Sequence, residues 1–264
     1  MPTTNIGDAT FYYETRGQGM PVVLLHGFPL DSRVWESQLE ALSDRYLVIA
    51  PDLRGFGKSR AGESFTIDSL ADDVHWLLKD LGTLPCALGG LSMGGYVALA
   101  YAKKYPEYLR GLLLIDTRAE ADPPAGRENR NRMIQTVRQH GPKAVADEMF
   151  PKMLCDETKQ QQPQVAQMLR DIMESQTAEA IEHALEALRD RPDRVPDLPA
   201  IACPAQVMVG EHDVITTPAM AKTMDENIPN SHLVTVLRAG HMSPMEQPDQ
   251  VTTAIRRFLE ELTT

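Results

Sequence analysis

The stretch of this chain whose residue types are best suited to chemistry is a serine between glycines, Gly90-Leu91-Ser92-Met93-Gly94. An uncharged run typical of a strand precedes it, and a helix-forming run follows it. Glycines beside the serine remove side chains that would clash where a strand turns sharply into a helix. Such a turn presents a hydroxyl to a neighbouring base, so the pattern predicts a nucleophile. The alternative is a turn of small residues that only packs a helix against a sheet.

A serine nucleophile needs an imidazole base to accept its proton. His241 directly follows the last expected strand, in a loop at the carboxyl edge of the sheet, where Ser92 is also expected. His241 is therefore the predicted base. We interpret the histidines inside expected helices or at the start of a strand as structural or solvent-facing: His75, His140, His183 and His232.

Two aspartates qualify as the carboxylate partner of the base. Asp213 ends the turn Gly210-Glu211-His212-Asp213, and Asp116 ends the expected strand over 109–115. Both satisfy the chain order serine, acid, histidine. Asp213 is favoured because its turn holds it at a defined position before a helix start. Asp116 is the reserve, with capping of the following helices as its other possible role.

Acyl transfer also needs hydrogen-bond donors for the charge that develops on the carbonyl oxygen. The backbone N–H of Met93, directly after the serine, is one candidate donor. The second is expected from the loop His26-Gly27-Phe28-Pro29, where proline has no N–H and Phe28 is the natural choice. Phe28 and Met93 are also the expected walls of the acyl pocket.

The bulk composition limits the kinds of partner. The 264 residues are 42% hydrophobic and 24% charged, as in a globular protein, and the net charge of −11 disfavours nucleic-acid or anionic-membrane surfaces. The first residues lack the features of a secretion signal, so we expect a cytoplasmic protein with no membrane partner. Its three cysteines are scattered and no histidine–cysteine cluster occurs, so we expect neither a metal nor a cofactor.

The elements that must position these residues alternate between strand and helix. A β-rich segment over 9–15 predicts an antiparallel hairpin at a sheet edge, and the apolar runs after it predict buried parallel strands. The alternation breaks over 118–196, where amphipathic helical segments predict an insertion without strands. The strands expected after the hairpin cover 22–25, 46–50, 86–89, 109–115, 206–209 and 233–237.

These motifs together resemble the α/β-hydrolase fold superfamily, and the resemblance covers nearly the whole chain. It implies a mostly parallel eight-stranded sheet flanked by helices, with a core domain of residues 1–117 and 197–264 and a helical cap of residues 118–196. It also implies that Ser92, Asp213 and His241 form a catalytic triad and that Phe28 and Met93 are the oxyanion donors. The motifs that carry it are His26-Gly27-Phe28-Pro29, Asp52-Leu53-Arg54-Gly55-Phe56-Gly57-Lys58-Ser59, Gly90-Leu91-Ser92-Met93-Gly94-Gly95, Gly210-Glu211-His212-Asp213 and Ala239-Gly240-His241.

Within that superfamily the chain is most similar to small-ester carboxylesterases, cofactor-free haloperoxidases or perhydrolases, and 3-oxoadipate enol-lactonases. The expected function is hydrolysis of a small carboxylic ester through an acyl-enzyme, with a small-molecule ester as the partner. An enol-lactonase or perhydrolase activity is one alternative, and a hydrolase-like small-molecule receptor is another. A serine nucleophile disfavours the dehalogenases and epoxide hydrolases of this fold, which use aspartate. The sequence leaves the oligomeric state open.

Overall fold

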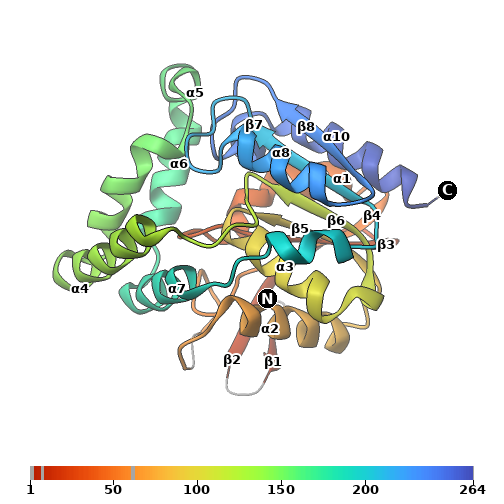
Figure 1. Ribbon diagram of the computed structural model, residues 1–264, viewed down its shortest axis with the longest axis horizontal. Helices are drawn as coiled ribbons and strands as arrows, with labels where there is room; N and C mark the ends of the chain where they lie inside the picture. Colours follow the sequence, from red (N-terminus) through yellow and green to blue (C-terminus); the bar gives the residue numbers. More distant parts are fainter. Residues whose placement is uncertain (1–2, 7–8, 61–62, 264) are drawn as a thin grey trace.

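One mixed sheet forms the centre of the computed structural model, which describes residues 3–6, 9–60 and 63–263 (Figure 1). The strand order is β1-β2-β4-β3-β5-β6-β7-β8. Strands β3 to β8 run parallel, whereas β2 pairs antiparallel with both β1 and β4. The eight-stranded, mostly parallel sheet and its antiparallel edge are therefore confirmed. The strands are β1 (Thr3–Ile6), β2 (Ala9–Arg16), β3 (Met20–Leu25), β4 (Tyr46–Pro51), β5 (Cys86–Leu91), β6 (Leu109–Ile115), β7 (Ala205–Gly210) and β8 (Ser231–Val236).

Helices cover both faces of the sheet because the central strands are apolar on both faces. Helices α1 (Glu36–Leu42) and α10 (Pro248–Glu261) pack on one face. Helices α2 (Ile67–Asp80), α3 (Met93–Lys104) and α8 (Pro218–Asn227) pack on the other. The shorter elements are η1 (Ser32–Trp35), η2 (Pro106–Tyr108), η3 (Val195–Ala200) and α9 (Ser243–Glu246).

Local signals explain where several of these helices begin. Thr66 and Ser69 form a reciprocal capping box at the start of α2, and Asp31 caps η1 by accepting a hydrogen bond from Arg33 N. Pro248 occupies the first turn of α10, where a missing N–H costs nothing. These starts agree with the sequence pattern.

Among the described residues, the segment between β6 and β7 contains helices and no strand, and its α-helices gather at one end of the sheet, on the left of Figure 1. Its first helix is kinked at Gly141, where φ is +76° and Pro142 follows. The next helices are amphipathic, with apolar stripes that pack into the core. The helices are α4 (Pro124–Met153), α5 (Asp156–Gln161), α6 (Pro163–Glu174) and α7 (Ala178–Asp190).

Candidate active site

Ser92 lies at the sharp turn between β5 and α3, with φ at +53°. The flanking glycines are required by close backbone contacts. A Cβ on Gly90 would lie 2.1 Å from the carbonyl oxygen of Gly94, and a Cβ on Gly94 would lie 2.4 Å from that of Leu25. Any larger residue at either position would push the turn away from the sheet. The turn thus holds the Ser92 hydroxyl above the carboxyl edge of the sheet in a backbone conformation that costs energy.

Three predicted side chains meet at this edge. Ser92 Oγ lies 2.9 Å from His241 Nε2, and His241 Nδ1 lies 2.8 Å from Asp213 Oδ2. Both His241 and Asp213 are buried, and Ser92 is partly accessible. The arrangement allows His241 to donate its Nδ1 proton to Asp213 while its Nε2 accepts the proton of Ser92.

The charges of this pair shift both pKa values. Burial alone would lower the pKa of His241, but the Asp213 carboxylate, together with the charges of Asp116 and Glu246, outweighs burial and raises it. Burial alone would raise the pKa of Asp213, but His241 and hydrogen bonds from Thr216 outweigh burial and lower it. Asp213 is therefore ionised at neutral pH, as the partner of an imidazole base must be.

The sequence pattern did not single out Thr216, which completes the setting of Asp213. Its hydroxyl donates to Asp213 Oδ2 at 2.6 Å and lies 3.1 Å from His241 Nδ1. Asp213 Oδ1 accepts hydrogen bonds from the backbone N–H groups of Ile215 and Thr216 at 2.7 and 3.0 Å. These bonds fix the orientation of the carboxylate. The signal that could have revealed them is an aspartate followed three residues later by threonine, a common turn pattern.

Asp116, the reserve acid, forms its side-chain hydrogen bonds with backbone groups other than those of His241. It is fully buried, with Oδ1 accepting from Gly210 N at 2.8 Å and Oδ2 accepting from Ser243 N at 3.1 Å. Burial and the nearby charge of Asp213 raise the pKa of Asp116 to about 8. The suggestion that Asp116 caps the inserted helices is wrong, because α4 begins at Pro124 behind Pro123. Asp116 instead joins the end of β7 to the segment that follows His241.

Glu246 holds the loop that carries His241. Its Oε1 accepts from Gly240 N and Met242 N at 2.8 and 3.1 Å, and its Oε2 accepts from Cys155 N at 2.8 Å. His241 N also donates to the carbonyl oxygen of Met153 at 3.0 Å. The end of α4 is therefore hydrogen-bonded to the histidine loop. No local pattern in the sequence indicated this role for Glu246.

The two expected oxyanion donors are Phe28, in the loop after β3, and Met93, the first residue of α3. Within the part of the chain that the structure describes, the N–H groups of Phe28 and Met93 donate to no protein acceptor. A Cβ on Gly27 would lie 3.1 Å from the Cβ of Ser92, which is tighter than an ordinary contact, so glycine favours this close approach. Both side chains are buried, and the Phe28 ring contacts Phe56 edge to face at 6.4 Å. Their roles as donors and pocket walls stay predictions.

His26, next to these donors, has a structural role. Its Nδ1 lies 2.8 Å from the carbonyl oxygen of Gly27, and its Nε2 accepts from Leu53 N at 2.9 Å. Burial lowers the pKa of His26, so the ring is neutral. The ring ties the loop after β3 to the turn after β4. In that turn Arg54 makes a two-pronged ion pair with Asp73 at 2.8 and 2.6 Å, and Gly55 has φ at +84°.

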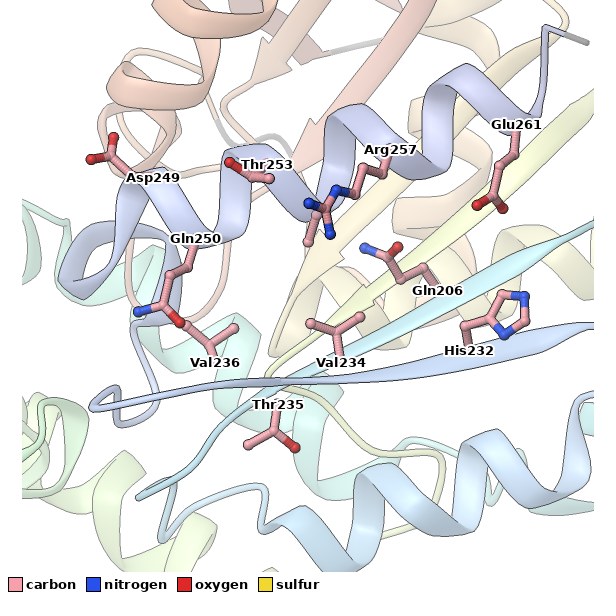
Figure 2. A pocket seen from close by; sticks show the side chains of 11 residues that line it. Gln206, His232, Val234, Thr235, Val236, Asp249, Gln250, Thr253, Arg257 and Glu261 are labelled. Atoms are coloured by element: carbon pink, nitrogen blue, oxygen red, sulfur yellow. The ribbon is translucent and has the colours of Figure 1, made fainter.

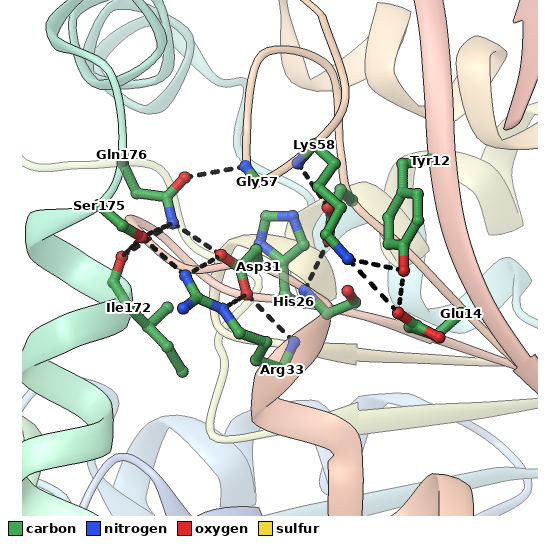
Figure 3. A network of polar contacts seen from close by, with 12 residues as sticks. Tyr12, Glu14, His26, Asp31, Arg33, Gly57, Lys58, Ile172, Ser175 and Gln176 are labelled. Atoms are coloured by element: carbon green, nitrogen blue, oxygen red, sulfur yellow. Dashed lines mark hydrogen bonds and ion pairs between the residues drawn. The ribbon is translucent and has the colours of Figure 1, made fainter. Parts of the chain in front are cut away.

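A polar network joins the inserted helices to these loops (Figure 3). Gln176, just after α6, donates to Asp31 Oδ2 at 2.9 Å and accepts from Gly57 N at 2.9 Å. Arg33 donates to Ser175 Oγ at 2.7 Å and pairs with Asp31. The insertion is therefore attached to the core on the side of the sheet edge where Phe28 lies.

Two cavities of the described structure are lined by neither Ser92 nor His241. One, of about 520 Å³, lies between β8 and α10 and is lined by Gln206, Val234 and Val236 among others (Figure 2). None of the predicted site residues lines it. The other, of about 300 Å³, is lined by α4 and by Val214 and Ile215, which directly follow Asp213. Among the described residues, no group of histidine, cysteine and acidic side chains could hold a metal ion, and no helix is long and apolar enough to cross a membrane.

The chain is similar to several known proteins over almost its whole length. A thermophilic esterase from Thermogutta terrifontis, solved with malate bound, is 44% identical with a TM-score of 0.95, over 99% of this chain and 97% of that one. An enol-lactonase from Burkholderia xenovorans is 29% identical with a TM-score of 0.91, over 98% and 100% of the two chains. The AB hydrolase superfamily protein YisY of Bacillus subtilis is 30% identical over 262 residues, 94% of this chain and 95% of its own. The family model described as the alpha/beta hydrolase fold matches residues 20–248, and the chain belongs to that family.

Proposed function

We propose that this protein is a carboxylesterase, which cleaves a small carboxylic ester through an acyl-enzyme intermediate. The observation that carries the proposal is the continuous chain of hydrogen-bond distances from Ser92 Oγ through His241 to Asp213. The esterase from Thermogutta terrifontis, at 44% identity over almost the whole chain, supports the same reaction class.

In the first half of the reaction His241 Nε2 takes the proton of Ser92 as Oγ attacks the acyl carbon. The N–H groups of Phe28 and Met93 stabilise the oxyanion of the tetrahedral intermediate, each by about 3 kcal/mol. Asp213 stabilises the imidazolium that forms. His241 then returns the proton from Nε2 to the leaving alkoxide, which departs as the alcohol.

In the second half water replaces the alcohol. His241 Nε2 takes a proton from the water as its oxygen attacks the acyl carbon of the ester on Ser92. The second tetrahedral intermediate collapses to the free acid, and the proton on Nε2 returns to Ser92 Oγ. The same groups serve both halves, so a single site is sufficient.

An enol-lactonase is the second candidate, supported by the likeness to the Burkholderia xenovorans enzyme. A lactone is a cyclic ester, so the roles of Ser92, His241 and Asp213 are unchanged. Only the shape of the pocket over Ser92 would distinguish the two substrates. A perhydrolase would need the acyl-enzyme to react with peroxide in place of water.

The test compares esters of graded acyl length and an enol-lactone, with the wild-type protein and the Ser92→Ala variant. Turnover of short acyl esters that disappears in S92A supports the carboxylesterase, whereas faster turnover of the lactone favours the second candidate. Labelling of Ser92 by an organophosphate, mapped by mass spectrometry, checks that the serine is activated. Tight small-molecule binding without turnover of any ester would instead indicate a receptor and overturn the proposal.

A further inference from the structure

The cavity of about 300 Å³ beside Asp213 combines an apolar wall with a cationic one. The apolar wall is formed by Met133 and Met149 of α4 together with Val214 and Ile215. Its volume is at the lower end of the range of ligand sites, about 300 to 1,000 Å³. We call this cavity the cationic pocket, after the three basic side chains that also line it, which are Arg118, Arg130 and Lys152.

The walls of the cationic pocket come from the same loops as the candidate active site. Val214 and Ile215 directly follow Asp213 in the chain, and Ile215 N donates to the Asp213 carboxylate. Arg118 directly follows Thr117, whose hydroxyl donates to the backbone oxygen of Ser92 at 2.8 Å. The pocket is therefore lined by residues of the loop after β6 and of the loop after β7, which also carry Thr117 and Asp213.

The charges around the cationic pocket do not balance. The Asp122 side chain is 2% exposed, and its two oxygens form ion pairs with Arg118, Arg130 and Arg191. Burial alone would raise the pKa of Asp122, but the guanidinium groups of Arg191 and Arg130 outweigh burial and lower it. Three of the charged side chains that line the pocket are cationic and two, Asp122 and Glu148, are acidic, so the local charge is positive in a chain whose net charge is −11. Charges removed from water need partners, so an anion in this pocket would be stabilised.

Two of the basic side chains retain donors for such an anion. The buried Nε of Arg118 has no hydrogen-bond partner in the described structure. Lys152 is exposed and forms no ion pair with any described residue. Glu148, the other acidic side chain of the lining, is already paired with Arg132. The free donors of the pocket are thus cationic, while its carboxylates are engaged.

We propose that the cationic pocket binds the free carboxylate of an ester whose acyl chain ends in a second carboxyl group, with that chain along Met133, Met149 and Ile215. The proposal deepens and rests on the proposed esterase function. The cationic side chains bind the distal carboxylate and take no part in bond breaking. The preferred substrate is therefore a monoester of a dicarboxylic acid.

The experiment compares monomethyl esters of dicarboxylic acids, from succinate to suberate, with methyl esters of monocarboxylic acids of the same chain length. Proton release is measured in a pH-stat, and the quantity of interest is the ratio of kcat/KM for the acidic ester to that for the neutral one. In the wild type this ratio exceeds one at the best chain length. In R130M and K152M the ratio falls, and for R130M the fall is about tenfold. The fall comes from a higher KM for the acidic ester, with little change in kcat. Added salt lowers the wild-type ratio because it screens the exposed ammonium.

The matched control is K143M, which removes the same charge from the same helix outside the cationic pocket. It leaves the ratio unchanged. An equal ratio in the wild type, R130M and K152M overturns the carboxylate site while the esterase stands. If no methyl ester is hydrolysed, calorimetric titration of adipate into S92A still tests the carboxylate site. Binding of adipate that is lost in S92A/R130M and S92A/K152M supports the site, and absence of binding to S92A overturns it.

Discussion

Replacing each buried aspartate by asparagine separates the two candidates for the catalytic acid. In Asp213→Asn the amide oxygen takes the place of Oδ1, because that position accepts two backbone N–H bonds from Ile215 and Thr216. The amide NH₂ group then faces His241 Nδ1. His241 is thereby favoured in the tautomer with its proton on Nε2, which cannot accept the proton of Ser92.

The expected loss follows from charge and tautomer together. The His241 and Asp213 side chains are 2% and 0% exposed, and the joined atoms lie 2.8 Å apart. At an effective dielectric of about 20, two unit charges about 4 Å apart attract by about 4 kcal/mol, which corresponds to about a thousandfold in rate. The wrong tautomer increases the loss, so we expect kcat of D213N to fall by about 10⁴.

The matched control is Asp116→Asn, at an equally buried site that touches Gly210 N and Ser243 N. It loses one acceptor and should lower the free energy of unfolding by about 1–3 kcal/mol, with kcat reduced less than about tenfold. Both variants are assayed with a short-chain p-nitrophenyl ester, after circular dichroism has shown that they fold. A loss of about a thousandfold in D116N, with D213N nearly intact, would refute the assignment of Asp213.

The remaining predictions concern pH, the strained serine and the attachment of the insertion. Asp213 raises the pKa of His241 above its ordinary 6.5, and only neutral imidazole accepts a proton. The kcat/KM should therefore rise with pH and reach half its maximum above pH 6.5. A midpoint below that value contradicts the ion pair. Ser92→Gly should abolish hydrolysis but be more stable than S92A by about 1 kcal/mol, because glycine tolerates the φ of +53°. The Tm of S92G should therefore be about 2–4 °C higher than that of S92A. Equal Tm values would show that the turn is unstrained. Gln176→Met should lower the free energy of unfolding by about 1–3 kcal/mol in urea melts. The control Gln167→Met, on the exposed face of α6, should change it by less than about 0.5 kcal/mol, and similar values for both variants would argue against the network in Figure 3.

The sequence predicted the features whose signals are local. Glycine spacing around Ser92 and apolar runs in the strands are properties of neighbouring residues, so the turn and the sheet could be read directly. The position of His241 followed from topology, because the carboxyl ends of parallel strands share one edge. The order of residues left Asp116 and Asp213 both possible as the partner of that histidine.

The structural contacts that distinguish Asp116 from Asp213 join residues far apart in the sequence, so no local pattern contains them. Asp116 meets backbone groups 94 and 127 residues further along the chain, so its structural role appears only in three dimensions. Glu246 likewise meets Cys155, 91 residues away. The charge balance of the cationic pocket depends on how α4 packs against the core. Amphipathic periodicity predicts which face of a helix is buried, but not which element packs against that face.

The hydrogen bonds between the end of α4 and the histidine loop limit how freely the insertion can be exchanged between related proteins. His241 N depends on the carbonyl of Met153, and Glu246 spans Gly240 and Cys155. A chimaera that replaces residues 118–196 as one block therefore also replaces part of the support of the base. Crossover points after Cys155 would leave these bonds in place, and a replacement of α5 to α7 would still have to keep two glutamines. Gln162 donates to the backbone oxygen of Glu246, and Gln176 joins the insertion to Asp31 and Gly57.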